Sequence, residues 1–158
     1  MSIAERLEEL NLTLPSPTVV PAGVRLPFKW VRVVGKNVYV SGHGPTAPDG
    51  SVTGPFGKVG GNVTPEEAYE AARLTALGML GNLQRELGDL ERLTWVRAFG
   101  MVNCAPGFVA TPNVINGFSD LILNVFGQER GQHARSAIGV AELPFNIPVE
   151  IEAEALLD

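Results

Sequence analysis

Arg135 is the residue whose type and setting most directly suggest chemistry. It stands in the run His133-Ala134-Arg135-Ser136, where a turn with Gly127 and Gly131 leads into an apolar segment. A guanidinium is planar and stays charged at any working pH, so its donors suit a carboxylate. An ordinary salt bridge to an acidic strand residue would use the same donors. A carboxylate-binding site and a structural ion pair therefore both remain open.

Three carboxylates stand near the C-terminus. Glu150, Glu152 and Glu154 alternate with apolar residues over positions 149–155, which predicts a strand with one apolar and one acidic face. The acidic face can simply be solvated. A carboxylate beside a buried apolar sheet can instead act as a general base.

The run Ser41-Gly42-His43-Gly44 follows a predicted strand. Its glycines expose backbone N–H groups that can bind a small anion. No Walker lysine or third glycine arrives at the required spacing, so the motif for a phosphate-binding loop is incomplete. A glycine-rich turn after an edge strand is the simpler interpretation.

Metal sites and serine hydrolysis find little support. The imidazole and thiol groups are His43, His133 and Cys104, with no C-x-x-C or H-x-x-x-H spacing and no G-x-S-x-G motif. The single cysteine permits no intrachain disulfide, which fits a reducing cytosol. We therefore expect no metal or other cofactor.

The length, charge and composition exclude several classes of protein. The 158 residues suit one domain, and a net charge of −5 offers no basic surface for nucleic acid or an anionic membrane. The N-terminus lacks a signal-peptide pattern, and no apolar run reaches the roughly 20 residues of a membrane helix. We expect a cytoplasmic protein.

The charged fraction suggests an oligomer. Charged residues make up 18% of the chain, against about 25% in typical domains, which predicts that part of the surface is buried in a homo-oligomer.

Periodicity and capping signals predict the elements. A short helix is expected over about 2–11, a proline-rich connection over 13–23, and a hairpin over 30–41 that turns at 35–37. A glycine-rich loop follows over 41–61. Further helices are expected over 64–88 and 111–127, and strands over 94–102, 136–140 and 149–155.

This pattern predicts an α+β, two-layer domain. The order β-β-α-β-α-β-β favours a mixed β-sheet with two helices on one face. We divide the chain into an N-terminal helix and extended arm over 1–24 and a single α+β domain over 25–158. The opposite face of the sheet is then bare unless another subunit covers it, in agreement with the low charge.

Four motifs in this order resemble a known family. They are Ser41-Gly42 after a hairpin, Ala134-Arg135-Ser136, Leu143-Pro144 and the run Val149-Glu150-Ile151-Glu152-Ala153. Over roughly residues 25–156 the chain resembles the Rid (YjgF-like) family of reactive-imine deaminases, long labelled endoribonuclease L-PSP. The resemblance implies a chorismate-mutase-like fold and a homotrimer around a β-barrel, with three clefts between subunits.

The resemblance also implies a site. Arg135 corresponds to the arginine that holds the substrate carboxylate, and Glu150 to the glutamate that positions or activates water. Ser41 and Gly42 would form the cleft wall, and Asn116 matches the asparagine of the second helix. By itself, Asn116 suggests a surface or capping residue. The implied reaction is hydrolysis of small 2-imino or enamine acids to 2-keto acids and ammonia, without a metal.

The chain departs from the family pattern near this site. Phe28 replaces the cleft tyrosine, Ala137 replaces the cysteine that often follows the A-R-S motif, and the stretch 103–111 differs. His43 and His133, which alone suggests a loop histidine, are additions, and they and Ser136 are accessory candidates. These features are typical of a divergent branch.

Two other functions compete with deamination. Arg135 could serve a non-catalytic protein that binds a keto acid or an amino acid. The older family label implies an endoribonuclease, which the net charge of −5 disfavours.

Overall fold

The computed structural model describes residues 1–158, which form three helices and one five-stranded sheet. The helices are α1 (Ile3–Glu9), α2 (Pro65–Leu87) and α3 (Thr111–Gly131), and a short 3-10 turn spans Pro144–Asn146. The strands are β1 (Val31–Val34), β2 (Asn37–His43), β3 (Leu93–Asn103), β4 (Ala134–Val140) and β5 (Val149–Leu157).

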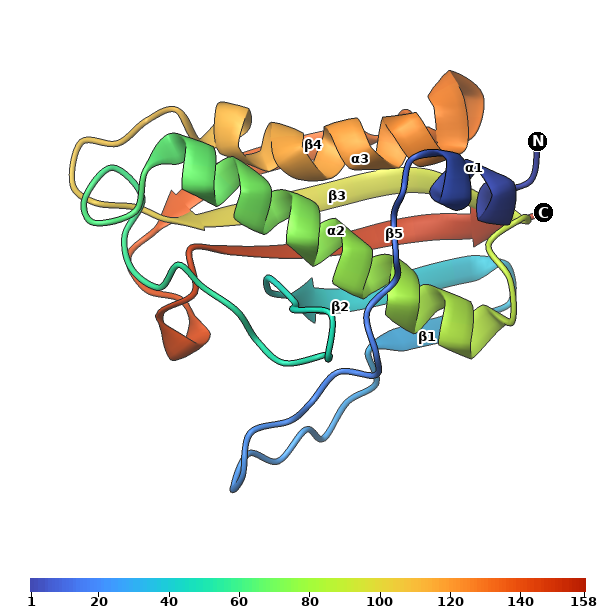
Figure 1. The fold of residues 1–158 in the computed structure, drawn as a ribbon, viewed down its shortest axis with the longest axis horizontal. Helices are drawn as coiled ribbons and strands as arrows, with labels where there is room; N and C mark the ends of the chain where they lie inside the picture. The colour runs from blue at the N-terminus through green and yellow to red at the C-terminus, as the bar shows by residue number, and fades with distance from the viewer.

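The sheet order is β1-β2-β5-β3-β4. Only β3 and β4 pair in parallel, and the other pairs are antiparallel, so the sheet is mixed. Helices α2 and α3 lie side by side over one face (Figure 1). The predicted α+β, two-layer fold is confirmed. We call the other side of the sheet the open face, because no element of the chain covers it.

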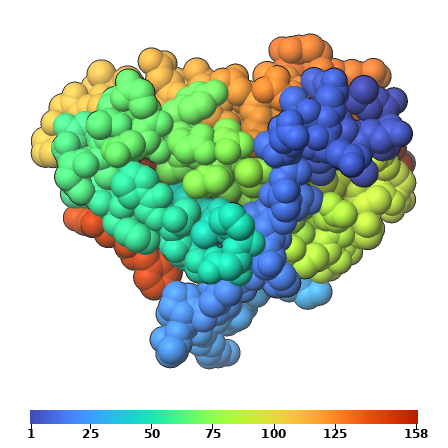
Figure 2. All heavy atoms as spheres, viewed as in Figure 1, coloured from blue at the N-terminus to red at the C-terminus, as the bar shows by residue number.

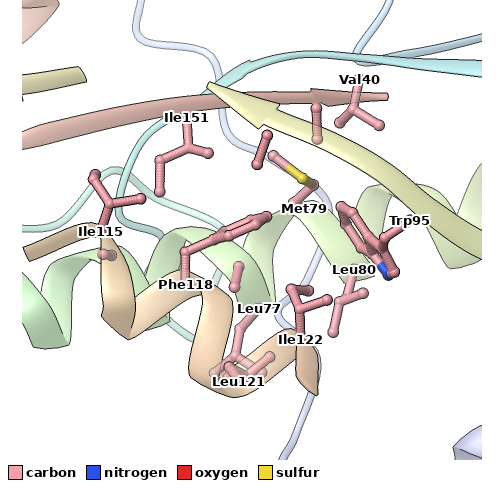
Figure 3. Packing of buried hydrophobic residues seen from close by; sticks show 14 of the residues in the cluster. Val40, Leu77, Met79, Leu80, Trp95, Ile115, Phe118, Leu121, Ile122 and Ile151 are labelled. Atoms are coloured by element: carbon pink, nitrogen blue, oxygen red, sulfur yellow. The ribbon is translucent and has the colours of Figure 1, made fainter. Parts of the chain in front are cut away.

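The hydrophobic core lies between the helices and the sheet. Phe118 of α3 is fully buried and reaches the edge of the Trp95 ring of β3, with ring centroids 5.7 Å apart. Met79 and Leu80 of α2 lie in the same layer, on the side of Val40 and Trp95 (Figure 3). These contacts fix both helices relative to the sheet.

Local signals set the start of α2 as predicted. The Thr64 side chain accepts from the Glu67 amide, the Glu67 carboxylate accepts from the Thr64 amide, and Pro65 occupies the first helical position. Gly88, at φ 86°, follows the last helical residue.

The end of α3 corrects one prediction. The helix was expected to stop at Gly127, but it is only interrupted there and continues to Gly131. Gly127 adopts φ 72° and ψ 178°, which only glycine reaches without strain. The break redirects the chain, and after Gly131 two connecting residues lead into β4 along the edge of the sheet.

The first 18 residues pack on the rest of the chain, and residues 19–23 are exposed. Ile3 and Leu7 of α1 belong to the same hydrophobic core as the sheet. The segment that follows runs across α2, where Arg85 donates to the Pro15 carbonyl and Asn82 to the Thr18 hydroxyl. Figure 2 shows this blue segment seated across the helix layer. No helix of the structure has the length and apolar character that a membrane span requires.

Candidate functional site

Arg135 lies on the edge strand β4 and points toward α3. It pairs with Ala98 of β3, whose side chain is buried under the helices, so both residues face the helix side of the sheet. Its Nη1 donates to Asn116 Oδ1 at 2.9 Å and to Ser119 Oγ at 3.1 Å, and Nη2 donates to the Pro112 carbonyl at 3.3 Å. Three groups at the start of α3 therefore fix the guanidinium.

Arg135 forms no ion pair within the chain. The five salt bridges of the structure join other residues, so the ordinary salt bridge is not its role here. Burial lowers the pKa of Arg135, and the charge of Asp120 opposes this. The bonded groups leave the Nε–Nη2 edge open, and that edge has the geometry to bind a carboxylate through two parallel hydrogen bonds.

Asn116 is half-buried and holds Arg135 instead of capping the helix or facing solvent. The interpretation of Asn116 as a surface or capping residue, drawn from its helix position alone, is wrong. The resemblance matched Asn116 to the asparagine of the second helix without giving it a partner, and in the structure its Oδ1 accepts from Arg135.

Ser119 is a residue that the sequence interpretation missed. It follows Asn116 by three positions on α3, so both lie on one helical face. His133, in the connection to β4, places Nε2 2.9 Å from Ser119 Oγ and Nδ1 2.7 Å from the Gly131 carbonyl. The i, i+3 spacing from Asn116 was the available signal.

Ser41 and Gly42 lie in a β-bulge of β2, a strand near the edge of the sheet opposite to β4. Val40 pairs with Ala153 and His43 with Ile151, so two residues of β2 oppose one residue of β5. Ser41 Oγ donates to the Lys29 carbonyl at 2.7 Å. Bulges occur often beside active sites because they redirect side chains.

Glu150 lies against this bulge on the open face. A Cβ atom on Gly42 would stand 2.8 Å from Glu150 Oε1, so any side chain there would displace the carboxylate from its present position. Burial, and secondarily the charge of Glu152, raise the pKa of Glu150. The carboxylate is half-buried and accepts no hydrogen bond from the chain. A carboxylate of this kind is suited to take a proton from water.

Phe28 lies at the rim of the same region. Its ring meets Trp30 edge to face at 5.5 Å, and half of its surface is exposed. A groove of about 680 Å³ runs from Phe28 past Lys29 to Ser41. Phe28 thus supplies apolar surface where the family tyrosine would supply a hydroxyl.

The remaining candidates are His43 on β2 and Ser136 and Ala137 on β4. His43 is buried beneath Trp30 on the helix side, where its Nδ1 bonds the Ser41 carbonyl and Nε2 meets Asn82. It packs against the bulge from the helix side of the sheet and does not reach the open face. Ala137 is half-buried next to Thr111, while Ser136 is exposed and pairs with Phe99.

Within one chain, Arg135 and Glu150 do not meet. Arg135 on β4 faces α3 and Glu150 on β5 faces the open side, and β3 lies between their strands. Strand spacing and rise put their Cα atoms about 14 Å apart. The structure forms two half-sites: Arg135, Asn116, Ser119 and His133 at the β4 edge under α3, and Ser41, Gly42, Glu150 and Phe28 around the β2–β5 pair.

No group of three His, Cys, Asp or Glu side chains comes close enough to hold a metal ion. The donor groups available are those of the two half-sites. They suit hydrogen bonding to a carboxylate and transfer of a proton.

Comparison with known proteins identifies relatives across the whole chain. Protein TCP17 of Trypanosoma cruzi is 40% identical over 154 residues, which cover 96% of this chain and 91% of that protein. The crystal structure of Atu1372 from Agrobacterium tumefaciens, a protein described as of unknown function, matches with a TM-score of 0.86 at 38% identity. It covers 99% of this chain and 92% of its own.

More distant structures share the fold. A "putative endoribonuclease" from Shewanella oneidensis MR-1 matches with a TM-score of 0.88 at 26% identity, covering 99% of this chain and all of its own. TdcF of Escherichia coli, solved with bound serine, matches with a TM-score of 0.60 at 20% identity over 92% and 96% of the two chains. The family model described as "YjgF/chorismate_mutase-like, putative endoribonuclease" matches residues 6–151. The chain belongs to the YjgF/L-PSP family.

Proposed function

We propose that the protein hydrolyses small reactive 2-imino or enamine acids to 2-keto acids and ammonia. The observation that carries this proposal is Glu150, a half-buried carboxylate with a raised pKa and no partner in the chain, held against a glycine that leaves it room. The bound serine of TdcF supports a small carboxylate-bearing ligand.

Arg135 would bind the substrate carboxylate through its open Nε–Nη2 edge. The bonds to Asn116 and Ser119 already orient the guanidinium, so little side-chain freedom is lost on binding. The imine carbon is then held in a fixed position for attack by water.

Glu150 would act as the general base. It takes a proton from water while the water oxygen bonds to the C=N carbon, and it passes that proton to the imine nitrogen to give the carbinolamine. Glu150 then takes the proton of the carbinolamine hydroxyl and delivers it to the nitrogen, so that the C–N bond breaks, the C=O bond of the keto acid forms and ammonia departs. Neither oxidation nor reduction occurs, so the reaction needs no electron carrier. The raised pKa of Glu150 helps it return the proton to the leaving nitrogen.

The half-sites require two copies of the chain. Arg135 and Glu150 face opposite sides of the sheet, so one copy must supply the arginine and a neighbour the glutamate. We propose a homotrimer in which the open faces meet in the centre and three clefts form between subunits. This arrangement also accounts for apolar residues such as Tyr39 and Ile138 that are exposed on the open face.

The test is release of keto acid and ammonia from 2-aminoacrylate generated in situ. We expect wild-type protein to raise the rate above the uncatalysed background. Glu150→Gln should lower kcat about 100-fold or more, and Arg135→Ala should remove saturation by substrate. Glu70→Gln and Arg73→Ala are matched controls, because these residues pair with each other on α2, away from both half-sites and from the open face. Wild-type rates in both site variants would remove this mechanism.

A non-catalytic binder of small carboxylates is the second candidate, because Arg135 suits a carboxylate whether or not turnover follows. Thermal stabilisation by pyruvate, lost in Arg135→Ala, without any acceleration of imine hydrolysis would support it. The family description also names endoribonuclease activity. The net charge of −5 and the glutamates of the open face disfavour an RNA substrate.

A further inference from the structure

We infer that Ser119 and His133 act as positioning residues that orient Arg135 for its carboxylate ligand. This inference rests on the proposed role of Arg135. It concerns the chain of hydrogen bonds Gly131 carbonyl, His133, Ser119 and Arg135, which joins the break in α3 to the guanidinium.

The first bond fixes the His133 tautomer. The Gly131 carbonyl can only accept, so Nδ1 carries the hydrogen of the 2.7 Å bond. Burial lowers the pKa of His133, the bond to the Gly131 carbonyl opposes this, and the charge of Arg135 lowers the pKa further, which together favour the neutral imidazole. A neutral ring with hydrogen on Nδ1 leaves Nε2 as an acceptor.

The second bond fixes the Ser119 hydroxyl. Because Nε2 accepts, Ser119 must donate its hydrogen across the 2.9 Å separation. The oxygen lone pairs then face Arg135, whose Nη1 donates to Oγ at 3.1 Å. A serine without His133 could turn its hydrogen toward the arginine and lose this contact.

The third bond sets the orientation of the guanidinium. Nη1 donates to Asn116 and Ser119, Nη2 makes only the longer contact with the Pro112 carbonyl, and Nε has no partner within the chain. The nitrogens Nε and Nη2 are therefore the ones available to a carboxylate. Without Ser119, only Asn116 and the longer Pro112 contact would hold the planar group, so it would be oriented less firmly.

The chemistry of the Ser119–His133 pair also suggests a nucleophile and its base. The structure favours the positioning role. Ser119 Oγ is engaged on both sides, as donor to His133 and as acceptor from Arg135, and Ser119 lies within the body of α3. Attack by this oxygen would break the contact that holds the arginine.

The experiment measures binding of pyruvate by calorimetry, and KM and kcat with 2-aminoacrylate, in Ser119→Ala and Ser119→Thr. We expect Ser119→Ala to raise the pyruvate Kd and the KM about 5- to 20-fold while kcat changes less than about twofold, since a hydrogen bond to a charged group is lost and the base is untouched. Ser119→Thr keeps the hydroxyl and should restore most of the affinity. Ser51→Ala, which removes a hydroxyl bonded only to Asp49, is the matched control.

His133→Gln and His133→Ala give the second comparison. Gln keeps an acceptor at the position of Nε2 and should bind pyruvate better than Ala. In an Arg135→Ala background, Ser119→Ala should have no further effect on pyruvate binding, because the group that it positions is gone.

The outcomes separate this inference from the proposed function. If Arg135→Ala leaves pyruvate binding unchanged, the carboxylate site itself is wrong. If Arg135→Ala weakens binding but Ser119→Ala does not, only the positioning role is overturned. Covalent labelling of Ser119 by an acylating probe, together with a loss of kcat in Ser119→Ala, would assign it as a nucleophile and also overturn the inference.

Discussion

The contact between Gly42 and Glu150 makes a single hydrogen-to-methyl change informative. Gly42→Ala places a Cβ atom 2.8 Å from Glu150 Oε1, so the carboxylate must move. We expect kcat to fall roughly 10- to 100-fold with little change in fold, because a displaced base no longer meets the water. Steady-state kinetics on the purified variant measure this.

Gly61→Ala is the control for that variant. Its Cβ would meet the Lys58 carbonyl at 3.3 Å, Ala105 at 3.4 Å and the Lys58 Cβ at 3.8 Å, away from both half-sites. Equal rates for Gly42→Ala and Gly61→Ala would mean that the position of Glu150 does not matter for turnover.

His43 makes stability depend on pH. Burial lowers its pKa to about 4, against 6.5 when unfolded. Between these values the unfolded chain binds a proton that the folded chain does not, so folding loses free energy as the pH falls from 6.5 to 4. The loss is about 3 kcal/mol at most, and above pH 6.5 it disappears.

His43→Gln tests this assignment, since Gln can donate to the Ser41 carbonyl and accept from Asn82 without titrating. Urea unfolding at pH 7 and pH 4.5 should show a smaller loss of stability in this variant than in wild type. The same pH dependence in both proteins would assign the acid sensitivity to other groups.

Among the elements, α3 has the least regular backbone. Gly127 has φ 72° and ψ 178°, and a Cβ there would meet no atom within 4 Å. Gly127→Ala should therefore destabilise the protein by about 1–3 kcal/mol through backbone strain alone. Gln128→Ala, at the next exposed position of the helix, should change stability by less than about 0.5 kcal/mol.

Denaturant unfolding of both variants gives the comparison. If Gly127→Ala is as stable as Gln128→Ala, the break in α3 can relax and does not depend on glycine.

The elements were predictable where their signals are local. The caps of α2, the turn after β1 and the alternation of β5 are contained in a few neighbouring residues, and each element was found within a few residues of its ends. The continuation of α3 past Gly127 was missed because a glycine after an apolar run is a common stop signal.

Only those site residues that stand in a short sequence motif could be predicted from the sequence. Arg135 and Glu150 stand in recognisable motifs, but their surroundings depend on pairing between distant segments. The bulge at Ser41 arises from the register of β2 against β5, and the bond from Arg135 to Ser119 depends on how β4 lies under α3. Neither is encoded in the spacing of adjacent residues.

For the whole molecule, the open face is the feature to test. Ile138 lies on this face and is 42% exposed, although it is a large apolar side chain. If copies meet there, Ile138→Arg should convert an assembly of three chains into monomers of 16.8 kDa in sedimentation at micromolar concentration. Val109→Arg, at a loop position that is 84% exposed, should leave the assembly intact.

A monomeric wild-type protein in the same experiment would contradict the proposed trimer. It would also leave Arg135 and Glu150 on opposite sides of one sheet, with no neighbour to join them.

Mixing of two inactive variants tests the central claim most directly. After partial denaturation and refolding together, Arg135→Ala and Glu150→Gln chains should form mixed trimers in which an intact arginine of one chain faces an intact glutamate of the next. Random mixing at equal concentration predicts about one quarter of wild-type imine hydrolysis, because one cleft in four then has both groups. Activity that stays at the level of the separate variants would show that the two half-sites do not join across subunits.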